Sequence, residues 1–188
     1  MTTKPTQTNS LSARERILLT AHDLFYANGI RATGIDRIIK HAKVTKVTFY
    51  RHFPSKHDLI IVFLEYRHQR WINWFTESIK RHGNTCDALI STLLEWFGSE
   101  HYRGCAFINS VGEVGETMPE VIQLSQQHKQ DMTTLIETLL TDSVDKKNTA
   151  NALALAVDGA IIRSQIDQDP RRAIEGLRKI VGALTAKY

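Results

Sequence analysis

Residues 33–53, TGIDRIIKHAKVTKVTFYRHF, decide the fold at the start of the chain. The first half of this stretch carries apolar side chains at the spacing of one buried helix face, namely Ile35, Ile38, Ile39 and Ala42. The pattern stops at Lys43, and Thr45 is suited to cap a short further helix that ends near His52. The Phe-Pro pair that follows closes that helix, because proline disfavours helical backbone in the residue before it. The sequence therefore predicts two short helices joined by a tight turn.

One further helix is predicted before this pair and another after it. Ser12 and Glu15 form an S-x-x-E capping box that starts a helix with one apolar stripe. The members of that stripe are Ile17, Leu18, Ala21, Leu24 and Phe25. Ser55 and Asp58 repeat the capping signal at the start of a long helix. The two short helices and their turn have the helix-turn-helix arrangement, in which the second helix enters the major groove of DNA.

The helix after the turn carries side chains that suit DNA. Lysine and arginine neutralise phosphates, and hydroxyl groups donate hydrogen bonds to phosphates or base edges. The side chains available for these contacts are Lys46, Thr48, Tyr50, Arg51 and His52. Val47 is suited to contact a thymine methyl group. Phe49 and Val44 are expected to face the three-helix core.

Charge is distributed unevenly along the chain. Residues 1–57 contain 10 Lys and Arg against 3 Asp and Glu, a net charge of +7. Residues 58–188 contain 14 against 17, a net charge of −3. The formal net charge of +4 therefore comes wholly from the first third. This concentration indicates a polyanionic partner, although a basic face that is merely solvated would give the same count.

The combined pattern closely resembles the TetR family of bacterial repressors. The residues that carry the resemblance are Thr33-x4-Ile38 and Val44-Thr45-Lys46-x-Thr48-Phe49-Tyr50-x-His52-Phe53-x-Ser55-Lys56-x-Asp58-Leu59. The match spans roughly residues 12–60. It implies a dimeric, sequence-specific transcriptional repressor that binds a palindromic operator in double-stranded DNA. It also implies that a small-molecule effector releases the operator.

The resemblance further implies which side chains face DNA. The matching positions are Thr33, Thr45, Lys46, Thr48, Tyr50, His52 and Lys56. Charge and position add Arg37 and Arg51 to this set. Lys43 stands where the family commonly has glycine, so it adds a cation but costs about 1 kcal/mol if the turn needs a positive φ. Val47 replaces a commoner small residue and is a further candidate contact.

The rest of the chain predicts more helices and no strand. Amphipathic segments with apolar residues at helical spacing are separated by short stretches that contain glycine or proline. The expected fold is all-α with about nine helices. Residues 1–11 are expected to be a disordered tail, residues 12–55 a helix-turn-helix DNA-binding domain, and residues 56–188 a helical bundle for ligand binding and dimerisation.

The last two helices are expected to form the interface of a homodimer. Small side chains recur there every four residues, and the family resemblance implies pairing into a four-helix interface. The predicted contacts are Ala152, Ala156, Gly159, Ala160, Ala173, Leu177, Ile180, Val181 and Leu184. An ordinary buried helix pair within one subunit would show the same pattern. A dimer is favoured because paired half-sites about 34 Å apart require a two-fold reader.

A pocket for the unidentified effector is expected among the bundle helices, because a small-molecule site is mostly apolar with a few polar groups. The aromatic candidates are Trp71, Trp74, Phe75, Trp96, Phe97 and Phe107. The polar candidates are Asn109, Glu113, His128, Asp158 and Arg163. Any one of the aromatic residues could equally belong to the core. Cys105 at a helix start is a candidate electrophile sensor, the alternative being a small buried side chain.

Other classes of protein find less support in the sequence. There is no apolar run of the roughly 20 residues that span a bilayer and no apolar leader, so we expect a cytoplasmic protein without a membrane partner. The two cysteines suggest neither a disulfide framework nor a metal site, and no catalytic motif or cofactor-binding loop is present. We therefore expect a regulator that is not an enzyme. The rivals are an activator and a helical small-molecule-binding protein or enzyme whose basic N-terminus is incidental.

Overall fold

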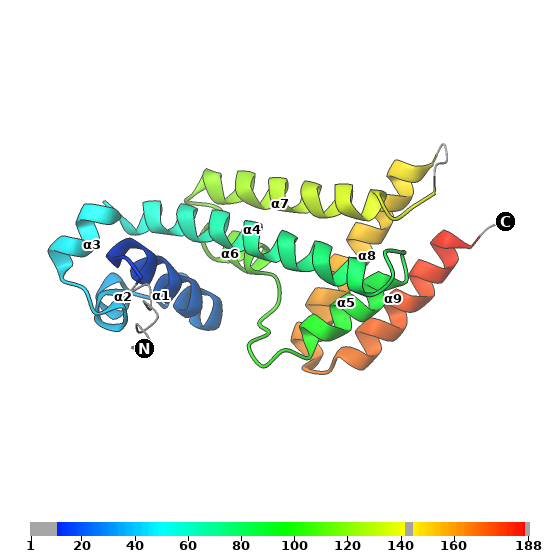
Figure 1. The fold of residues 1–188 in the computed structure, drawn as a ribbon, viewed down its shortest axis with the longest axis horizontal. Coiled ribbons are helices and arrows are strands. Elements are labelled where there is room, and N and C mark those ends of the chain that lie inside the picture. Colours follow the sequence, from blue (N-terminus) through cyan, green and yellow to red (C-terminus); the bar gives the residue numbers. More distant parts are fainter. Residues whose placement is uncertain (1–10, 142–144, 187–188) are drawn as a thin grey trace, which may run out of the picture. The chain divides into compact units, whose positions relative to one another are not determined.

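The computed structural model describes residues 11–141 and 145–186, so most of the tail expected at residues 1–11 lies outside the described residues. Within these ranges the chain forms nine α-helices and no strand (Figure 1), which confirms the expected all-α fold. The helices are α1 (Ala13–Asn28), α2 (Ile35–Ala42), α3 (Lys46–His52), α4 (Lys56–Arg81), α5 (Ala88–Phe97), α6 (Ala106–Val114), α7 (Pro119–Glu137), α8 (Lys146–Asp167) and α9 (Pro170–Thr185). None of these described helices has both the length and the apolar character that a bilayer crossing requires.

The chain divides into two compact units, residues 1–63 and residues 64–188. The division falls inside α4, so about two turns of this helix belong to the first unit. This compact unit ends at Phe63, and both Leu59 and Phe63 are buried. The ring of Phe63 lies 5.3 Å from that of Phe25 on α1.

The first unit is built around one apolar core. The capping box at the start of α1 is formed as expected: Ser12 Oγ accepts from the N–H of Glu15 at 3.2 Å, and Glu15 Oε2 accepts from the N–H of Ser12 at 2.8 Å. The buried core side chains of this unit include Ile17, Ala21, Phe25, Ile38, Phe49, Phe53, Leu59 and Phe63. Arg16 Nε donates to the carbonyl of Ala42 at 3.2 Å, which holds the end of α2 against α1.

The turn between α1 and α2 is held by Gly29 and Thr33. Gly29 ends α1 with φ of 89°, a value that favours glycine. Thr33 is fully buried, and its hydroxyl donates to the carbonyls of Gly29 at 2.7 Å and Leu24 at 3.3 Å. Thr33 therefore ties the turn to the end of α1, and α2 begins after Gly34, which makes no side-chain capping bond.

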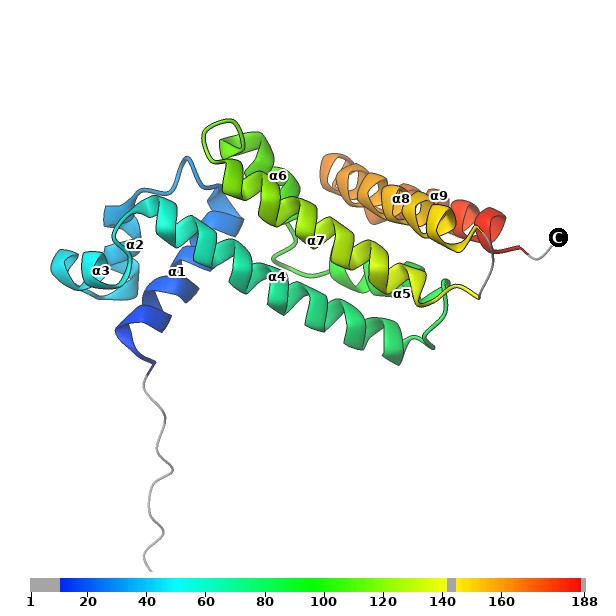
Figure 2. The same ribbon diagram turned by 90° about the horizontal axis from the view of Figure 1, so that it is seen from above.

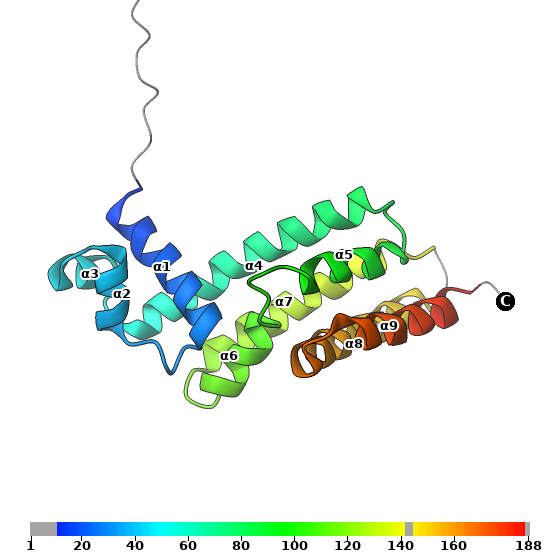
Figure 3. The same cartoon turned by 90° about the horizontal axis from the view of Figure 1, so that it is seen from below.

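The second unit is a bundle of α5 to α9 with the remaining turns of α4. Helix α7 lies alongside α4 (Figures 1 and 2), and the rings of Trp71 and His128 are 5.0 Å apart. Helices α8 and α9 form an antiparallel pair (Figure 3). The turn between them ends as the sequence predicts, because Asp169 accepts from the N–H of Arg171 at 3.0 Å and Pro170 is the first helical residue.

Candidate functional site

Helix α3 presents one face to the core and the other to solvent. Phe49 is fully buried, and its ring lies 5.3 Å from that of Tyr50. On the opposite side Val47 is 70% exposed and Tyr50 is 39% exposed. Lys46 and Arg51 are exposed as well. One buried aromatic anchor thus turns a polar, cationic surface outward.

Two threonines hold the start of α3. Thr45 Oγ1 accepts a hydrogen bond from the N–H of Thr48 at 3.1 Å, which confirms the expected cap. The two side-chain hydroxyl oxygens lie 2.9 Å apart, so each hydroxyl orients the other. This pairing fixes the geometry at the entry of the helix before any partner binds.

Lys43 lies in the turn between α2 and α3 with left-handed backbone, φ 52° and ψ 50°. Its N–H bonds to the carbonyl of Lys40 at 3.4 Å and ends α2. The turn therefore does require a positive φ at this position. A residue other than glycine there reduces the free energy of unfolding by about 1 kcal/mol. Since the side chain is exposed, the strained position also contributes a cation to the surface beside α3.

The remaining predicted DNA contacts differ in their exposure and in the hydrogen bonds that they already make. Arg37 on α2 is exposed, and His52 is half-buried. Lys56 Nζ donates to the carbonyl of Ile30 at 2.6 Å, so its ammonium group is partly engaged by the backbone of its own unit. The side chain of Thr33 is fully buried, which corrects its assignment as a DNA contact.

Five of the six predicted aromatic residues lie on α4 and α5, whereas Phe107 lies on α6. Trp71 stacks on Phe75 with ring centroids 4.5 Å apart and an angle of 16° between the rings. Trp96 lies 5.5 Å from Trp71 and 6.1 Å from Trp74, and Phe97 lies 6.0 Å from Trp96. The three tryptophans line a cleft of about 320 Å³. Phe75 and Phe97 are buried behind it.

Four polar residues that the sequence analysis did not select line the same cleft: Arg67, Arg70, Glu95 and Ser99. Arg67 and Arg70 each precede a cleft tryptophan by four residues and therefore share its face of α4. That periodicity is readable in the sequence. The packing of α5, which makes this face one wall of a cleft, is not.

His128 lies on α7 and is 2% exposed. Its ring stacks on Phe107 at 3.8 Å, and its Nδ1 lies 3.2 Å from Nδ1 of His68. Burial lowers the pKa of His128 from 6.5 to about 2, and the charges of Lys129, His68 and Arg67 act in the same direction. His128 is therefore neutral at physiological pH.

The neutral His128 makes the stability of the second unit depend on pH. An unfolded chain takes up a proton at this histidine below pH 6.5, whereas the folded chain does not until about pH 2. The unfolded state therefore binds more protons below pH 6.5, and the free energy of unfolding should fall there by about 1.4 kcal/mol per pH unit. Urea unfolding between pH 7.5 and about pH 5 measures this slope.

A pair of variants isolates the contribution of His128. His128→Phe keeps a ring against Phe107 and should remove one proton from the slope. His101→Gln, in the exposed loop before α6, should leave the slope as in the unmodified protein. Equal slopes for the unmodified protein and His128→Phe would contradict the prediction.

Cys105 immediately precedes α6 and is 4% exposed, so its thiol is screened from solvent. Lys129 Nζ lies 3.5 Å from Cys105 Sγ and 2.5 Å from Oδ1 of Asp158. This burial fits a small packed side chain, and the sensor role stays a prediction. The sequence analysis did not select Lys129, because its contact with Asp158 depends on the packing of α7 against α8.

The other polar candidates for the pocket differ in position. Arg163 bonds to Asp167 on its own helix at 3.1 Å and lines a groove toward α9, so it belongs to the α8–α9 surface and not to the aromatic cleft. Asn109 Nδ2 donates to the carbonyl of Arg103 at 2.9 Å and holds the loop before α6. Glu113 is half-buried on α6, and its role stays a prediction.

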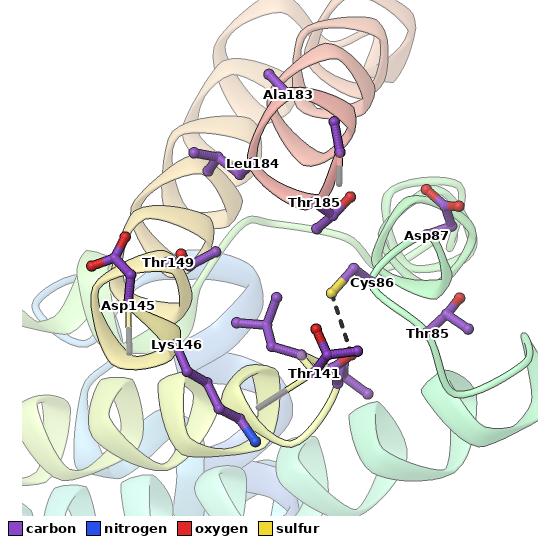
Figure 4. Close-up of a pocket in the computed structure, with 13 residues that line it drawn as sticks. Thr85, Cys86, Asp87, Thr141, Asp145, Lys146, Thr149, Ala183, Leu184 and Thr185 are labelled. Carbon is purple, nitrogen blue, oxygen red and sulfur yellow. Dashed lines mark hydrogen bonds between the residues drawn. The ribbon is translucent and has the colours of Figure 1, made fainter. Parts of the chain in front are cut away.

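Two further hollows lie in the second unit. One of about 370 Å³ between α6 and α7 is almost wholly apolar and includes Phe107 and Lys129 in its lining. The other, of about 580 Å³, is formed by the start of α5, the start of α8 and the end of α9 (Figure 4). Cys86 Sγ lies there 3.6 Å from the carbonyl of Leu139.

An apolar face covers the outside of α8 and α9. Its exposed large side chains are Leu155, Ile162, Ile166, Ile180 and Leu184. The first three recur at intervals of seven and four residues on α8, a signal that the sequence analysis overlooked in favour of the small residues. Between the two helices runs a groove of about 280 Å³ whose lining includes Ala156, Gly159 and Gly176. We refer to these residues and the groove as the α8–α9 face.

The predicted interface residues fall into two groups. Ala160, Ala173, Leu177 and Val181 are buried within the subunit, where they pack α8 and α9 together, so Val181 in particular is not a surface contact. Gly159, Ile180 and Leu184 are exposed, and Ala152 and Ala156 are half-buried. A helical stripe predicts which residues are buried but not whether the covering helix comes from the same subunit or from a partner.

Comparison with known proteins gives concordant results along the chain. A sequence profile described as bacterial regulatory proteins, tetR family, matches residues 17–62. The HTH-type transcriptional regulator UidR of Escherichia coli K12 is 25% identical over 192 residues, which cover 95% of each chain. The HTH-type transcriptional repressor NemR of the same strain is 27% identical over 106 residues, 54% of this chain and 53% of NemR. The crystal structure of SCO4454, a TetR-family transcriptional regulator from Streptomyces coelicolor, has a TM-score of 0.80 and 29% identity, covering 93% of this chain and 96% of that one.

Proposed function

The chain belongs to the TetR family of bacterial regulatory proteins, and on that premise we propose that it is a dimeric transcriptional repressor released from its operator by a small molecule. One observation carries this proposal: Lys46, Val47, Tyr50 and Arg51 are exposed on α3, opposite the buried Phe49. Cationic side chains hold phosphates, and an apolar tip suits a thymine methyl group. The proposed target is a palindromic operator in the bacterial cytoplasm.

The proposed DNA-contact set extends from α3 to its neighbours. It consists of Arg37, Lys43, Thr45, Lys46, Val47, Thr48, Tyr50, Arg51, His52 and Lys56. Thr33 is left out because its side chain is buried. Contacts to phosphate position the protein, whereas side chains that reach base edges specify the sequence. We assign positioning to the cationic residues of this set and specificity to Val47, whose apolar tip suits a thymine methyl group.

We propose that two copies pair through the α8–α9 face. Five large apolar side chains are exposed on it, and contiguous apolar surface of this kind commonly marks a protein–protein contact. In a two-fold dimer the same face serves both subunits, so the side chains of one α8 can enter the groove of the other. A two-fold dimer supplies the two α3 helices that the two half-sites of a palindromic operator require.

We propose that α4 couples ligand to DNA. It is one continuous helix that carries Lys56 in the first unit and Trp71 and Trp74 in the second. A ligand that prefers a conformation with α4 displaced would lower operator affinity in proportion to its preference, about tenfold for each 1.4 kcal/mol. Coupling of a few kcal/mol is therefore sufficient for release.

Lys46→Ala and Tyr50→Ala test the DNA-binding role. Each should weaken operator binding roughly 5- to 150-fold, since contacts of this kind contribute roughly 1–3 kcal/mol. If Lys46 contacts a phosphate, its removal should also reduce the dependence of log affinity on log salt by about 0.9. Fluorescence anisotropy at several salt concentrations measures both quantities, with an operator selected from random duplexes.

Lys147→Ala is the matched control. Lys147 is exposed on α8, so this substitution removes the same charge from the second unit. It should leave affinity and salt dependence unchanged. A protein that binds no duplex at any salt concentration would support a helical small-molecule-binding protein or enzyme instead. Binding that increases transcription from the operator would support an activator.

A further inference from the structure

The cleft between α4 and α5 combines an aromatic wall with guanidinium groups. Trp71 and Trp74 from α4 and Trp96 from α5 form the wall, and Arg67 and Arg70 extend from the same face of α4. Its volume of about 320 Å³ is at the lower end of the range for small-molecule sites. A site of this size suits a compact ligand of one or two rings.

Trp71 supplies a second reason to expect a ligand. It is 6% exposed, and among the described residues its indole Nε1 is buried without a hydrogen-bond partner. A buried donor without an acceptor destabilises the protein, so such groups are uncommon in native structures. Trp71 lines the cleft, and a ligand with an acceptor oxygen could satisfy this donor after a small adjustment of the ring.

The charge of the cleft favours an anion. Its one carboxylate, Glu95, is already engaged by Arg81 at 3.0 Å, His82 at 3.2 Å and Ser78 at 3.2 Å. These hydrogen bonds, above all the one from Arg81, hold the pKa of Glu95 below its usual value. Glu95 is thus compensated from outside the cleft and does not neutralise Arg70.

Arg70 is the arginine best suited to hold an anion. Among the described residues its side chain forms one hydrogen bond, a long one of 3.4 Å to the neutral hydroxyl of Tyr66, and no ion pair. Its side chain is exposed at the cleft, so the guanidinium can turn to a ligand without breaking a strong contact. The planar guanidinium fork binds a carboxylate through two parallel hydrogen bonds.

We propose that this cleft binds a planar aromatic carboxylate, with the ring against the tryptophans and the carboxylate on Arg70. Offset or edge-to-face contact with an indole favours a flat ring over an aliphatic chain. The ionised carboxylate form of the ligand matters, because a charged acceptor gains most from the guanidinium. The claim that such a carboxylate is the effector rests on the proposed function. The claim that the cleft binds it does not.

Isothermal titration calorimetry of the full-length protein with three matched probes tests the inference. The probes are 1-naphthoate, the neutral 1-naphthamide and the cationic 1-naphthylmethylammonium, which share one ring system and differ in charge. We expect 1-naphthoate to bind at least tenfold more tightly than 1-naphthamide and the cation to bind most weakly. Equal binding of the three, or tightest binding of the cation, would overturn the proposal.

Variants assign the binding to the cleft. Arg70→Gln should weaken 1-naphthoate at least tenfold and leave 1-naphthamide unchanged, while Arg178→Gln, an exposed arginine on α9, should change neither. Trp71→Phe removes the indole N–H and should weaken 1-naphthoate, and its melting temperature reports whether it is folded. If Arg70→Gln leaves the affinity for 1-naphthoate unchanged, the ligand binds elsewhere and the assignment to this cleft is refuted.

Operator binding measured in parallel separates this inference from the repressor proposal. Operator binding without 1-naphthoate binding would refute the carboxylate site and leave the DNA-binding role intact. Binding of 1-naphthoate without any duplex binding would support the site and refute the repressor. Binding of both ligands with no mutual effect would leave the site in place and refute release by this ligand class.

Discussion

Gly159→Arg is expected to convert the proposed dimer into a monomer and to weaken operator binding at least a hundredfold. Gly159 is exposed on α8 in the middle of the α8–α9 face, and a Cβ added there meets no heavy atom within 4 Å. The isolated subunit therefore accepts a side chain at this position. A two-fold interface would not, because it would have to bury an arginine without a counter-charge, which is strongly unfavourable.

Loss of pairing should be visible in affinity because two half-sites bound together give an avidity of roughly 10²–10⁴ over one. Sedimentation velocity measures the assembly state, and fluorescence anisotropy measures the operator affinity. The subunit itself should be no less stable, since replacing a mid-helix glycine removes a helix penalty of about 1 kcal/mol. A stable, folded monomer with weak DNA binding is the expected result.

Gly112→Arg provides the matched control. Gly112 is exposed on α6, and a Cβ there also meets no heavy atom within 4 Å. The substitution adds the same side chain and the same charge away from the α8–α9 face, so the dimer and operator affinity should be retained. If Gly159→Arg remained dimeric, the α8–α9 face would not be the interface.

Phe49→Ala is expected to unfold the first unit while the second unit stays folded. Phe49 is fully buried, and truncation of a buried phenylalanine costs about 3–5 kcal/mol. A unit of about 60 residues buries a small core and has little stability to lose. Operator binding should therefore be abolished, although Phe49 itself faces away from the proposed DNA surface.

Hydrogen exchange resolves the two units. Peptides from α1, α2 and α3 should lose protection in Phe49→Ala, whereas peptides from α8 and α9 should keep it. Tyr50→Ala truncates the adjacent aromatic residue, which is 39% exposed, and should weaken DNA binding without loss of protection. Native protection of the first unit in Phe49→Ala would refute the role of this side chain as the anchor of α3.

The helix-turn-helix surface was predictable because its signals are local. Thr45 caps the helix that follows it, and the spacing around Phe49 decides which side of α3 is buried. Lys43 was recognised as a possible positive-φ residue for the same reason. The resemblance placed Thr33 against DNA, whereas its hydroxyl bonds back to the end of α1, an outcome that only the path of the turn decides.

The second unit was less predictable because its sites depend on contacts distant in sequence. The spacing of Ala173, Leu177 and Val181 correctly indicated a buried stripe, but the covering helices belong to the same subunit. Arg70 was overlooked because nothing near it in sequence shows that α5 completes a cleft. Lys129, which lies against Cys105 and Asp158, was missed for the same reason.

Lys43 places two requirements on one residue that no single amino acid meets. The left-handed backbone favours glycine. A cation is favourable beside α3, the helix proposed to contact DNA. Glycine there would relax the backbone and discard the charge, and arginine would retain both the charge and the strain. Natural variation or engineering at this turn therefore exchanges folding stability for attraction to a polyanion. A more stable protein with the same affinity for DNA needs two coordinated changes, a glycine in the turn and a new cation on a nearby exposed position.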